Sequence, residues 1–493
     1  MSKFNEFISH YCSCRWRLCY ATFFALLLMQ TLRVDLSMSL VCMLKTPNRT
    51  IDEVDLTLDN EHCSRLDNRT SNGENFEGEF EWSNILQSNM LAGYFYGYTV
   101  TNLLGGVLAD KYGGKKVMGA SIFSASVLTV LHPSLTRISG YFTLVLRILT
   151  GLVSGPMFPA VQSLWGRWAP PSESSTLIGI SFAGQILGSI VGLSTSGFLC
   201  VYGFDNGWGS IFYIFGGLSL VFSFVWIYVV YDNPNVHPTI SEEERSYLNK
   251  TIKCKSKVKN VPWKSIMTST AVWAIIMAHT LINWTVISFQ VILPLYMKEA
   301  LSIDTKSNGL MSSAPFIGQM IAIPFCGRFA DFLRSKNYLS TRSIRVLFQS
   351  VSYIGSASLI IVIGFLDCNQ TSLAGILFFI TGISLTFYYA GLSVNHVDIA
   401  PKYAGILYGI TNTFASLPGF LVPLTTKALT PNGTRQEWQI VFSLCAIFSV
   451  CGTAIYATFA RGHVQDWAKS DEKSIKNSSN EEESIHLKEE KQG

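Results

Sequence analysis

Charged side chains are scarce in this sequence of 493 residues, of which Asp, Glu, Lys and Arg make up only 14%. Soluble domains usually carry about 25% charged residues, so this scarcity excludes an ordinary soluble protein. The sequence also lacks the HExxH and HxxxH patterns of zinc enzymes and any CxxC spacing that suggests a metal. We therefore expect no enzyme activity, no metal site, no cofactor and no nucleic-acid partner.

Long apolar runs fill the sequence instead, and 48% of its residues are hydrophobic. About 20 consecutive apolar residues form a helix that spans a bilayer. The residue alternation of an outer-membrane barrel is missing. We expect an all-α membrane protein with twelve transmembrane helices, at about residues 18–44, 84–109, 115–132, 138–161, 175–200, 208–231, 268–297, 308–330, 343–366, 371–396, 403–427 and 437–460.

The positions of basic residues and glycosylation sequons predict one orientation in the membrane. Lys and Arg collect on one side of the alternating spans, at 15–17, 111–116, 245–264, 328–345 and 461–473. The positive-inside rule places this side, and both termini, in the cytosol. Four sequons fall on the opposite side and are expected to be glycosylated: Asn48, Asn68, Asn369 and Asn432.

An internal repeat indicates two related halves. The pattern from Gly106 to Ala109-Asp110 returns at Gly327-Arg-Phe-Ala330-Asp331, and the motif around Ala169-Pro170 returns at Ala400-Pro401. Both motifs recur after nearly the same number of residues, which indicates duplication of a six-helix unit. The expected regions are a cytosolic N-terminus (1–17), an N-terminal half (18–231) with a glycosylated loop (45–81), a cytosolic linker (232–264), a C-terminal half (265–460) and a disordered tail (461–493).

Two arginines in the apolar spans are the first candidates for a binding site. Arg147 lies inside the segment 138–161, where an arginine costs about 3 kcal/mol on insertion scales and must face protein or water. A permanently charged guanidinium suits capture of an anion, although a salt bridge to another helix is the alternative. Arg33 and Asp35 are two residues apart and point to different faces, so at least one needs a partner elsewhere.

Other polar residues in the spans allow two interpretations each. His279 is either a proton carrier or a histidine that hydrogen-bonds one neighbour. Asp35 either takes part in coupling or lies near a helix end that water reaches. The run of Asn395, His396 and Asp398 before a proline is more typical of a helix-end lock than of a substrate contact. Cys63 and Cys368 fall in non-cytosolic loops and could form a disulfide.

The motifs together resemble solute-carrier family seventeen, the organic anion–cation symporters. The motifs that carry the resemblance extend over about residues 15 to 468 and include Leu32-Arg-Val-Asp-Leu-Ser, Arg147 with Phe158-Pro-Ala, Trp168-Ala-Pro-Pro, Asn283-Trp-Thr, Leu293-Pro-Leu-Tyr-Met-Lys and Asn395-His-Val-Asp-Ile-Ala-Pro. The resemblance is closer to the sialin-like branch than to the glutamate transporters, which have histidine and arginine where this sequence has Leu91 and Asn283. It implies a major facilitator fold and transport of small organic anions or phosphate.

One departure from the family concerns ion coupling. The resemblance predicts glutamates one and two turns after Arg147, but this sequence has Thr150 and Ser154 there. A carboxylate that binds and releases a proton is what couples protons to an anion. We therefore expect sodium or the membrane potential to drive transport, with Asp35 or His279 as the proton carriers if protons are coupled.

We predict a secondary active transporter that moves sialic acid, acidic amino acids, urate-like anions or phosphate by alternating access. A transporter-fold receptor or sensor and a non-coupled anion channel are the alternatives. The expected anion-binding residues are Arg33, Arg147, Tyr98, Asn283, Tyr296 and Asn412, and the expected gating or structural residues are Gly106, Asp110, Ala330, Asp331, Asn395, His396 and Asp398. We expect a monomer in the plasma membrane or in a lysosomal or vesicular membrane.

Overall fold

The computed structural model describes residues 13–45, 78–170, 173–252, 261–401 and 403–469. These residues form helices and connecting segments, and no named strand occurs among them. Eleven helical stretches in the described part are long and apolar enough to cross a membrane. The 29-residue helix α3 (Asn84–Tyr112) lies in the same bundle and brings the number to twelve, which confirms the predicted fold class.

The N-terminal half consists of α2 (Cys14–Met43), α3, α4 (Gly114–Ile138), α5 (Gly140–Ser154), α6 (Met157–Trp168), α7 (Ser174–Tyr202) and α8 (Trp208–Val229). The C-terminal half consists of α11 (Thr270–Ile287), η2 (Ser288–Ile292), α12 (Leu293–Glu299), α13 (Thr305–Ser335), α14 (Thr341–Gly364), η3 (Cys368–Gln370), α15 (Thr371–Tyr388), η4 (Tyr389–Ser393), α16 (Val394–Ile399), α17 (Ala404–Ala415), α18 (Pro418–Leu429) and α19 (Arg435–Phe459). The short elements η1 (Pro234–Val236), α9 (Glu242–Thr251) and α10 (Trp263–Thr268) lie between the halves in sequence.

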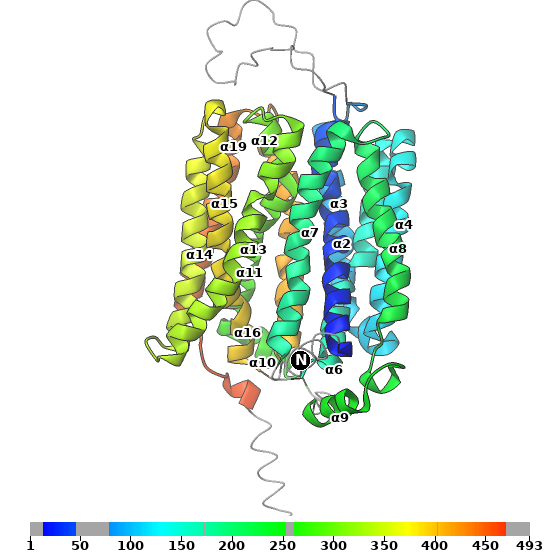
Figure 1. Ribbon diagram of the computed structural model, residues 1–493. Helices are drawn as coiled ribbons and strands as arrows, with labels where there is room; N and C mark the ends of the chain where they lie inside the picture. Colours follow the sequence, from blue (N-terminus) through cyan, green and yellow to red (C-terminus); the bar gives the residue numbers. More distant parts are fainter. Residues whose placement is uncertain (1–12, 46–77, 171–172, 253–260, 402, 470–493) are drawn as a thin grey trace, which may run out of the picture.

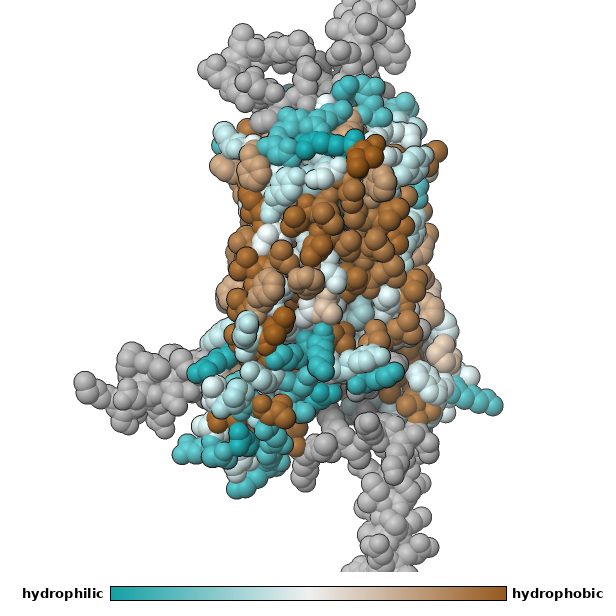
Figure 2. All heavy atoms as spheres, turned by 90° about the vertical axis from the view of Figure 1, so that its right-hand side faces the viewer, coloured by the Kyte–Doolittle hydropathy of each residue, from teal (hydrophilic) through white to brown (hydrophobic). Residues whose placement is uncertain are grey.

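The two halves stand side by side with their helices roughly parallel to one direction (Figure 1). We call the end that carries α9, α10 and α16 the inner end, and the end with α12 and the start of α19 the outer end. Figure 2 shows a broad band of hydrophobic residues around the middle of the bundle and hydrophilic residues toward both ends. This band is what a helical bundle needs in order to contact the hydrocarbon core of a bilayer.

Glycines bring α3 and α5 close together. A Cβ added to Gly151 would lie 1.8 Å from the carbonyl oxygen of Tyr94, and one added to Gly155 would lie 2.8 Å from the carbonyl oxygen of Tyr98. A side chain at either position would force the two helices apart. This close packing places the tyrosines of α3 next to Arg147 of α5, where the site described below is built.

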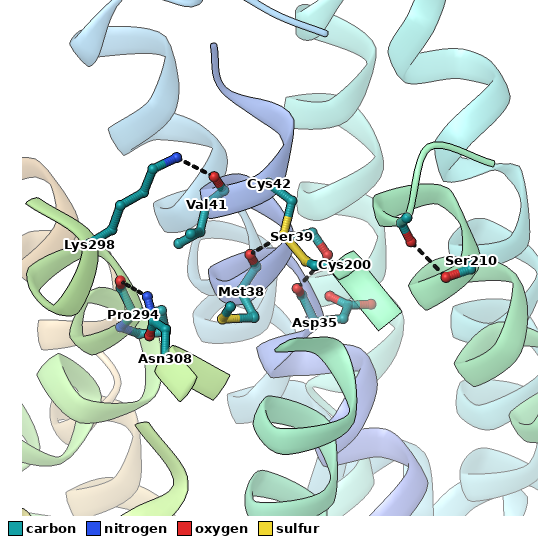
Figure 3. The surroundings of a disulfide bond; sticks show 11 residues. Asp35, Met38, Ser39, Val41, Cys42, Cys200, Ser210, Pro294, Lys298 and Asn308 are labelled. Atoms are coloured by element: carbon teal, nitrogen blue, oxygen red, sulfur yellow. Dashed lines mark hydrogen bonds between the residues drawn. A yellow bond between two sulfur atoms is a disulfide. The ribbon is translucent and has the colours of Figure 1, made fainter. Parts of the chain in front are cut away.

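The two halves contact each other at the outer end. The backbones of Gly197 in α7 and Gly309 in α13 approach so closely that a Cβ on Gly197 would lie 2.8 Å from the Gly309 Cα. Nearby, the hydroxyl of Ser194 donates a hydrogen bond of 2.9 Å to that of Ser313. The Lys298 ammonium of α12 donates to the carbonyl of Val41 at the end of α2 (Figure 3).

A disulfide joins the outer ends of two helices of the N-terminal half. It links Cys42 of α2 to Cys200 of α7, next to the contact that Lys298 makes with Val41 (Figure 3). The predicted pairing of Cys63 with Cys368 lies outside the described residues and side chains. Cys42 and Cys200 fall inside or at the ends of predicted spans, so counting loop cysteines could not find this bond.

Four glycines toward the inner ends of α3, α7, α13 and α17 have free space around them. A Cβ added to Gly106 of α3, Gly179 of α7, Gly327 of α13 or Gly409 of α17 would meet no described atom within 4 Å. Asp331 is exposed and forms no ion pair with another described residue. The two halves are therefore in close contact at the outer end, and these glycines at the inner end make no such contact.

The segment between the halves is anchored on the N-terminal half. Glu244 of α9 accepts hydrogen bonds from the backbone N–H groups of Cys14 (3.0 Å) and Arg15 (3.1 Å), at the first turn of α2. The Arg15 guanidinium forms ion pairs with Glu244 (3.1 Å) and with Glu173 (2.8 Å). Glu244 thus satisfies backbone donors that a helix leaves free at its N-terminus.

Candidate functional site

Arg147 of α5 is buried against α2 and forms an ion pair there. Its side chain is 4% exposed, and its NH1 group lies 2.9 Å from the Oδ1 atom of Asp35. The same guanidinium donates to the carbonyl oxygens of Leu32 (3.1 Å) and Arg33 (3.0 Å). The structure therefore places Arg147 in the salt bridge that the sequence left as an alternative, and supplies the partner that Asp35 required.

Asp35 uses only one of its carboxylate oxygens. Its Oδ1 accepts from Arg147 and, at 2.6 Å, from the backbone N–H of Leu36. Its Oδ2 is buried and has no hydrogen-bond partner among the described residues. A buried carboxylate oxygen without a donor is costly, so this atom is where a proton could bind.

Arg33 has a different environment, because aromatic rings surround it. Its guanidinium carbon lies 5.5 Å from the ring centroid of Tyr94, 4.8 Å from that of Phe95 and 5.6 Å from that of Tyr98. These distances are typical of cation–π contacts. No ion pair joins Arg33 to a described carboxylate, and its Nε atom is buried without a partner. Arg33 is thus the cation of the site that keeps its charge uncompensated.

The rings around Arg33 lie where the two halves meet. A Cβ added to Gly419 of α18 would lie 1.9 Å from the Phe95 ring. Asn412 of α17 lies near the hydroxyl of Tyr98. Asn283 of α11 is half-buried, and its side chain forms no hydrogen bond with another described residue. Tyr98 and Asn412 therefore belong to the surroundings of Arg33, as their assignment to the anion site requires.

Tyr296 packs among residues of the C-terminal half. Its hydroxyl donates to the carbonyl of Ile363 at 3.2 Å, and its ring packs against Phe378, Trp438 and Phe442. The side chain is 2% exposed. These contacts place Tyr296 in the packing of the C-terminal half in this conformation, and its assignment to the anion site stays a prediction.

The two residues that replace the family's acids on α5 are bonded to their own helix. The hydroxyl of Thr150 donates to the carbonyl of Leu146 at 2.8 Å, and that of Ser154 donates to the carbonyl of Thr150 at 2.6 Å. Neither side chain can release a proton near neutral pH. The carboxylate beside Arg147 comes from α2 instead of α5.

His279 and His396 meet in the C-terminal half. Both rings are buried and both hydrogen-bond the hydroxyl of Thr411, at 3.3 Å from the Nδ1 of His279 and 2.9 Å from the Nε2 of His396. Thr411 was not singled out in the sequence, because only the fold brings α11, α16 and α17 together. A third buried histidine, His132, was also not singled out in the sequence; it stacks on Phe212 with ring centroids 4.5 Å apart.

The other polar residues of α16 make structural contacts. Asp398 forms a buried ion pair with Arg345 of α14, with 2.6 Å between Nε and Oδ2. Asn395 donates to the carbonyl of Arg461 at 2.9 Å. These bonds join the end of α16 to α14 and to the segment after α19, which fits the interpretation of this run as a helix-end lock.

The repeated glycine and aspartate motifs lie at the inner end. Gly106 makes no close helix contact in this conformation; the close approach is made by its neighbour Gly105, where a Cβ would lie 2.6 Å from the Cα of Pro156. Ala330 is buried among apolar residues, whereas Asp331 is exposed. The side chain of Asp110 lies outside the described ones. A latch role for Gly106 and Asp331 thus stays a prediction for a conformation that closes the inner end.

Two predicted glycosylation sites lie on the outer surface. Asn369, in η3, and Asn432, just before α19, are both exposed. Asn48 and Asn68 lie outside the described residues. No group of three or more His, Cys, Asp or Glu side chains that could hold a metal ion occurs among the residues that were described.

A family model and known transporters match this chain over most of its length. The model of the Major Facilitator Superfamily matches residues 20–423. Sialin of Homo sapiens is 38% identical over 462 residues, which are 93% of this chain and 92% of sialin. Vesicular glutamate transporter 2 of Homo sapiens is 35% identical over 405 residues, which are 81% of this chain and 69% of that protein.

Solved structures share the fold at low sequence identity. A bacterial homologue of the human lysosomal transporter Spinster, in an inward-facing and unoccupied conformation, aligns with a TM-score of 0.66 and 11% identity over 92% of this chain and 99% of that one. A D-xylose–proton symporter aligns with a TM-score of 0.63 and 13% identity over 91% and 98% of the two chains. This chain therefore belongs to the Major Facilitator Superfamily, in the family of sialin and the vesicular glutamate transporters, whose members are membrane transporters and not enzymes.

Proposed function

We propose that this transporter carries small monovalent organic anions, such as sialic acid, by alternating access between its two halves. The observation that carries the proposal is the environment of Arg33. Its guanidinium lies at the meeting point of the halves, is enclosed by aromatic rings, and has no described carboxylate beside it. A carboxylate bound there would gain two charge-assisted hydrogen bonds from one planar group.

The balance of charges favours an anion with a single negative charge. Arg147 is neutralised by Asp35 in the described conformation, so the group of three residues leaves one net positive charge, on Arg33. A phosphate dianion would keep an unpaired charge in a buried site, which is costly. The hydroxyl of Tyr98 and the amides of Asn412 and Asn283 would serve the polar groups of the substrate.

Asp35 makes proton coupling the better supported mechanism. Protonation of its free Oδ2 would remove the negative charge of Asp35, which opposes an anion in this group of three residues, and so would favour the substrate carboxylate at Arg33. The proton and the anion would then need each other at the site, which is the requirement for symport. The expected preference for sodium or the membrane potential rested on the missing acids of α5, and Asp35 supplies an acid from α2.

The orientation and the membrane are part of the proposal. The inner end, which carries α9 and α10 and the described ends of the chain at Ser13 and Lys469, would face the cytosol. The described conformation would then release its substrate to the cytosol, and an outward-open conformation would follow separation of Gly197 from Gly309. A lysosomal, vesicular or plasma membrane would provide the proton gradient, and a monomer would suffice because both halves of the site come from one chain.

Uptake into proteoliposomes tests this function. The purified full-length protein would be given radiolabelled N-acetylneuraminic acid, glutamate, aspartate, urate or phosphate, under an imposed pH gradient, a sodium gradient or a potassium diffusion potential. We expect a monocarboxylate to accumulate with the pH gradient, and Asp35→Asn to remove the pH dependence before it removes binding. Accumulation of phosphate alone, or uptake driven by sodium and indifferent to pH, would contradict the proposal.

A further inference from the structure

A hydrogen-bonded chain of two histidines and a threonine crosses three helices of the C-terminal half. The Nδ1 of His396 lies 3.0 Å from the carbonyl oxygen of Ser393, and its Nε2 lies 2.9 Å from the hydroxyl of Thr411. The same hydroxyl lies 3.3 Å from the Nδ1 of His279. Both rings are almost fully buried, at 4% and 2% exposure for His279 and His396.

The hydrogen-bond partners of His279 and His396 determine which ring nitrogens carry hydrogens when both rings are neutral. A carbonyl oxygen only accepts, so the Nδ1 of His396 must donate to Ser393 and its Nε2 must accept from Thr411. The Thr411 oxygen then accepts from the Nδ1–H of His279. Every hydrogen bond of the chain runs in one direction, from His279 through Thr411 to His396 and Ser393.

A second complete arrangement exists with one more proton. If His396 carries hydrogens on both nitrogens, its Nε2 donates to the Thr411 oxygen, which has two lone pairs and can still accept from His279. The Thr411 hydrogen then turns to the carbonyl of Tyr408, which already lies 3.1 Å away. The chain can therefore gain a proton without losing a hydrogen bond, by rotation of one hydroxyl.

We propose that the His279–Thr411–His396 chain is a second proton-binding site of this transporter, separate from the Asp35–Arg147 pair. A structural cluster of histidines needs only one of the two hydrogen-bonding arrangements. Here the positions of the partners allow both hydrogen-bonding arrangements. Because the hydroxyl of Thr411 connects the two rings, a proton that reaches His279 can be passed on to His396 by exchange through this hydroxyl.

The groups around the chain leave the added charge without a carboxylate. The rings of Tyr388 and Tyr408 lie 5.8 Å and 6.2 Å from that of His279, and Tyr353 donates to the carbonyl of Ala278 beside it. The nearby Asp398 is engaged by Arg345. A proton on the chain would therefore add a positive charge that an incoming anion could offset.

Helix α17 connects this chain with the anion site, because Asn412, a candidate for the anion site, directly follows Thr411. Tyr408, on the same helix, packs its ring against both histidines. The effect on anion transport rests on the proposed function, whereas proton binding itself does not. A positive charge on the chain would strengthen anion binding at Arg33.

Nuclear magnetic resonance of the full-length protein in lipid nanodiscs tests the site without any substrate. Histidine labelled with 15N at both ring positions reports tautomer and protonation, and His279→Gln and His396→Gln assign the signals. Between about pH 8 and about pH 4, we expect both rings to start as Nδ1–H tautomers and one of them to become doubly protonated. Two rings that stay neutral throughout would overturn the proposal, as would an Nε2–H tautomer of His396 at high pH.

A matched pair of variants isolates the bridge. Thr411→Ser keeps the hydroxyl and should titrate as the wild type does, whereas Thr411→Val keeps the shape, removes the hydroxyl and should suppress the doubly protonated form. Identical titrations of Thr411→Val and the wild type would also overturn the proposal. If the rings titrate as expected but no anion of the uptake panel is transported, the proposed function fails and the proton site stands.

Discussion

The Arg147 guanidinium and the Asp35 carboxylate, which are 112 residues apart in the sequence, form an ion pair with 2.9 Å between NH1 and Oδ1. Both side chains are almost completely buried, at 4% and 0% exposure. A buried pair of this kind contributes little net stability as long as it is intact, but breaking it leaves a charge uncompensated. The first prediction follows from this asymmetry.

Replacing one member of the pair should destabilise the protein more than replacing both. Arg147→Ala leaves the Asp35 charge buried without a partner, which costs about 3–5 kcal/mol. The double variant Arg147→Ala with Asp35→Asn removes both charges and should recover most of the lost stability. Thermal unfolding of the purified variants measures this. Equal losses in the single and double variants would show that the two charges do not interact.

Arg33 should behave in the opposite way, with a loss of transport at nearly unchanged stability. Arg33→Ala removes the uncompensated cation, and the lost charge-assisted hydrogen bonds of about 1.5–3 kcal/mol correspond to roughly 10- to 100-fold weaker anion binding. Arg33→Lys keeps the charge but not the planar pair of donors, so it should transport poorly as well. Proteoliposome uptake and unfolding temperature are the two measurements. Uptake by Arg33→Ala at the wild-type rate would remove Arg33 from the anion site.

Closure of the outer end should depend on Gly197. Gly197→Leu places a side chain where even a Cβ would lie 2.8 Å from the Gly309 backbone, so the described conformation becomes inaccessible. Gly217→Leu is the matched control, because a Cβ at Gly217 of α8 meets no described atom within 4 Å. We expect folded protein from both variants by size-exclusion chromatography and uptake only from the control. Normal uptake by Gly197→Leu would show that this contact is not needed.

His237, in the segment between the halves, should make stability sensitive to acid. Its Nδ1 accepts a hydrogen bond of 3.2 Å from the backbone N–H of Thr239, which requires an unprotonated nitrogen. Burial, together with the positive charges of Arg17 and Lys115, lowers the pKa of His237 below its usual value. The unfolded chain therefore binds this proton at higher pH than the folded chain does.

The stabilisation from neutral His237 is thus complete above the ordinary histidine pKa of about 6.5 and decreases as the pH falls below it. His237→Gln, which does not titrate, should flatten this part of the curve of unfolding temperature against pH. Equal curves for His237→Gln and the wild type would assign the acid sensitivity to other groups.

Glycosylation checks the proposed orientation. Asn369 and Asn432 are exposed at the outer end, so treatment of the expressed protein with a glycosidase should increase its gel mobility. The shift should vanish when Asn48, Asn68, Asn369 and Asn432 are all replaced, and a tag on either terminus should be reached by antibody only after permeabilisation. Labelling of a terminal tag in intact cells that carry the protein on their surface would reverse the orientation.

The sequence predicted the helices better than the contacts between them. Apolar runs report directly which residues enter a membrane, so the span expected at 175–200 corresponds to α7 at Ser174–Tyr202. The close packing of Gly151 on Tyr94 was also foreseeable, because small residues in membrane helices permit close approach. These properties are local, and a single segment of the sequence contains them.

The partners of the site residues were not foreseeable, because they depend on how each helix is rotated about its axis. The spacing of Arg33 and Asp35 showed that they face apart, but not that Asp35 turns to Arg147 while Arg33 turns to the rings of α3. The bridge by Thr411 was hidden for the same reason: a threonine in an apolar helix carries no signal until two histidines from other helices meet it.

The disulfide between Cys42 and Cys200 also depends on how the chain was inserted into its membrane. Its cysteines are 158 residues apart, and every helix from α2 to α7 must be threaded before they meet. Disulfides form in the oxidising compartments outside the cytosol. In the proposed orientation, a chain with one of these helices left out or inverted would leave one thiol in the cytosol, so the bond marks molecules whose first helices were inserted in the right order.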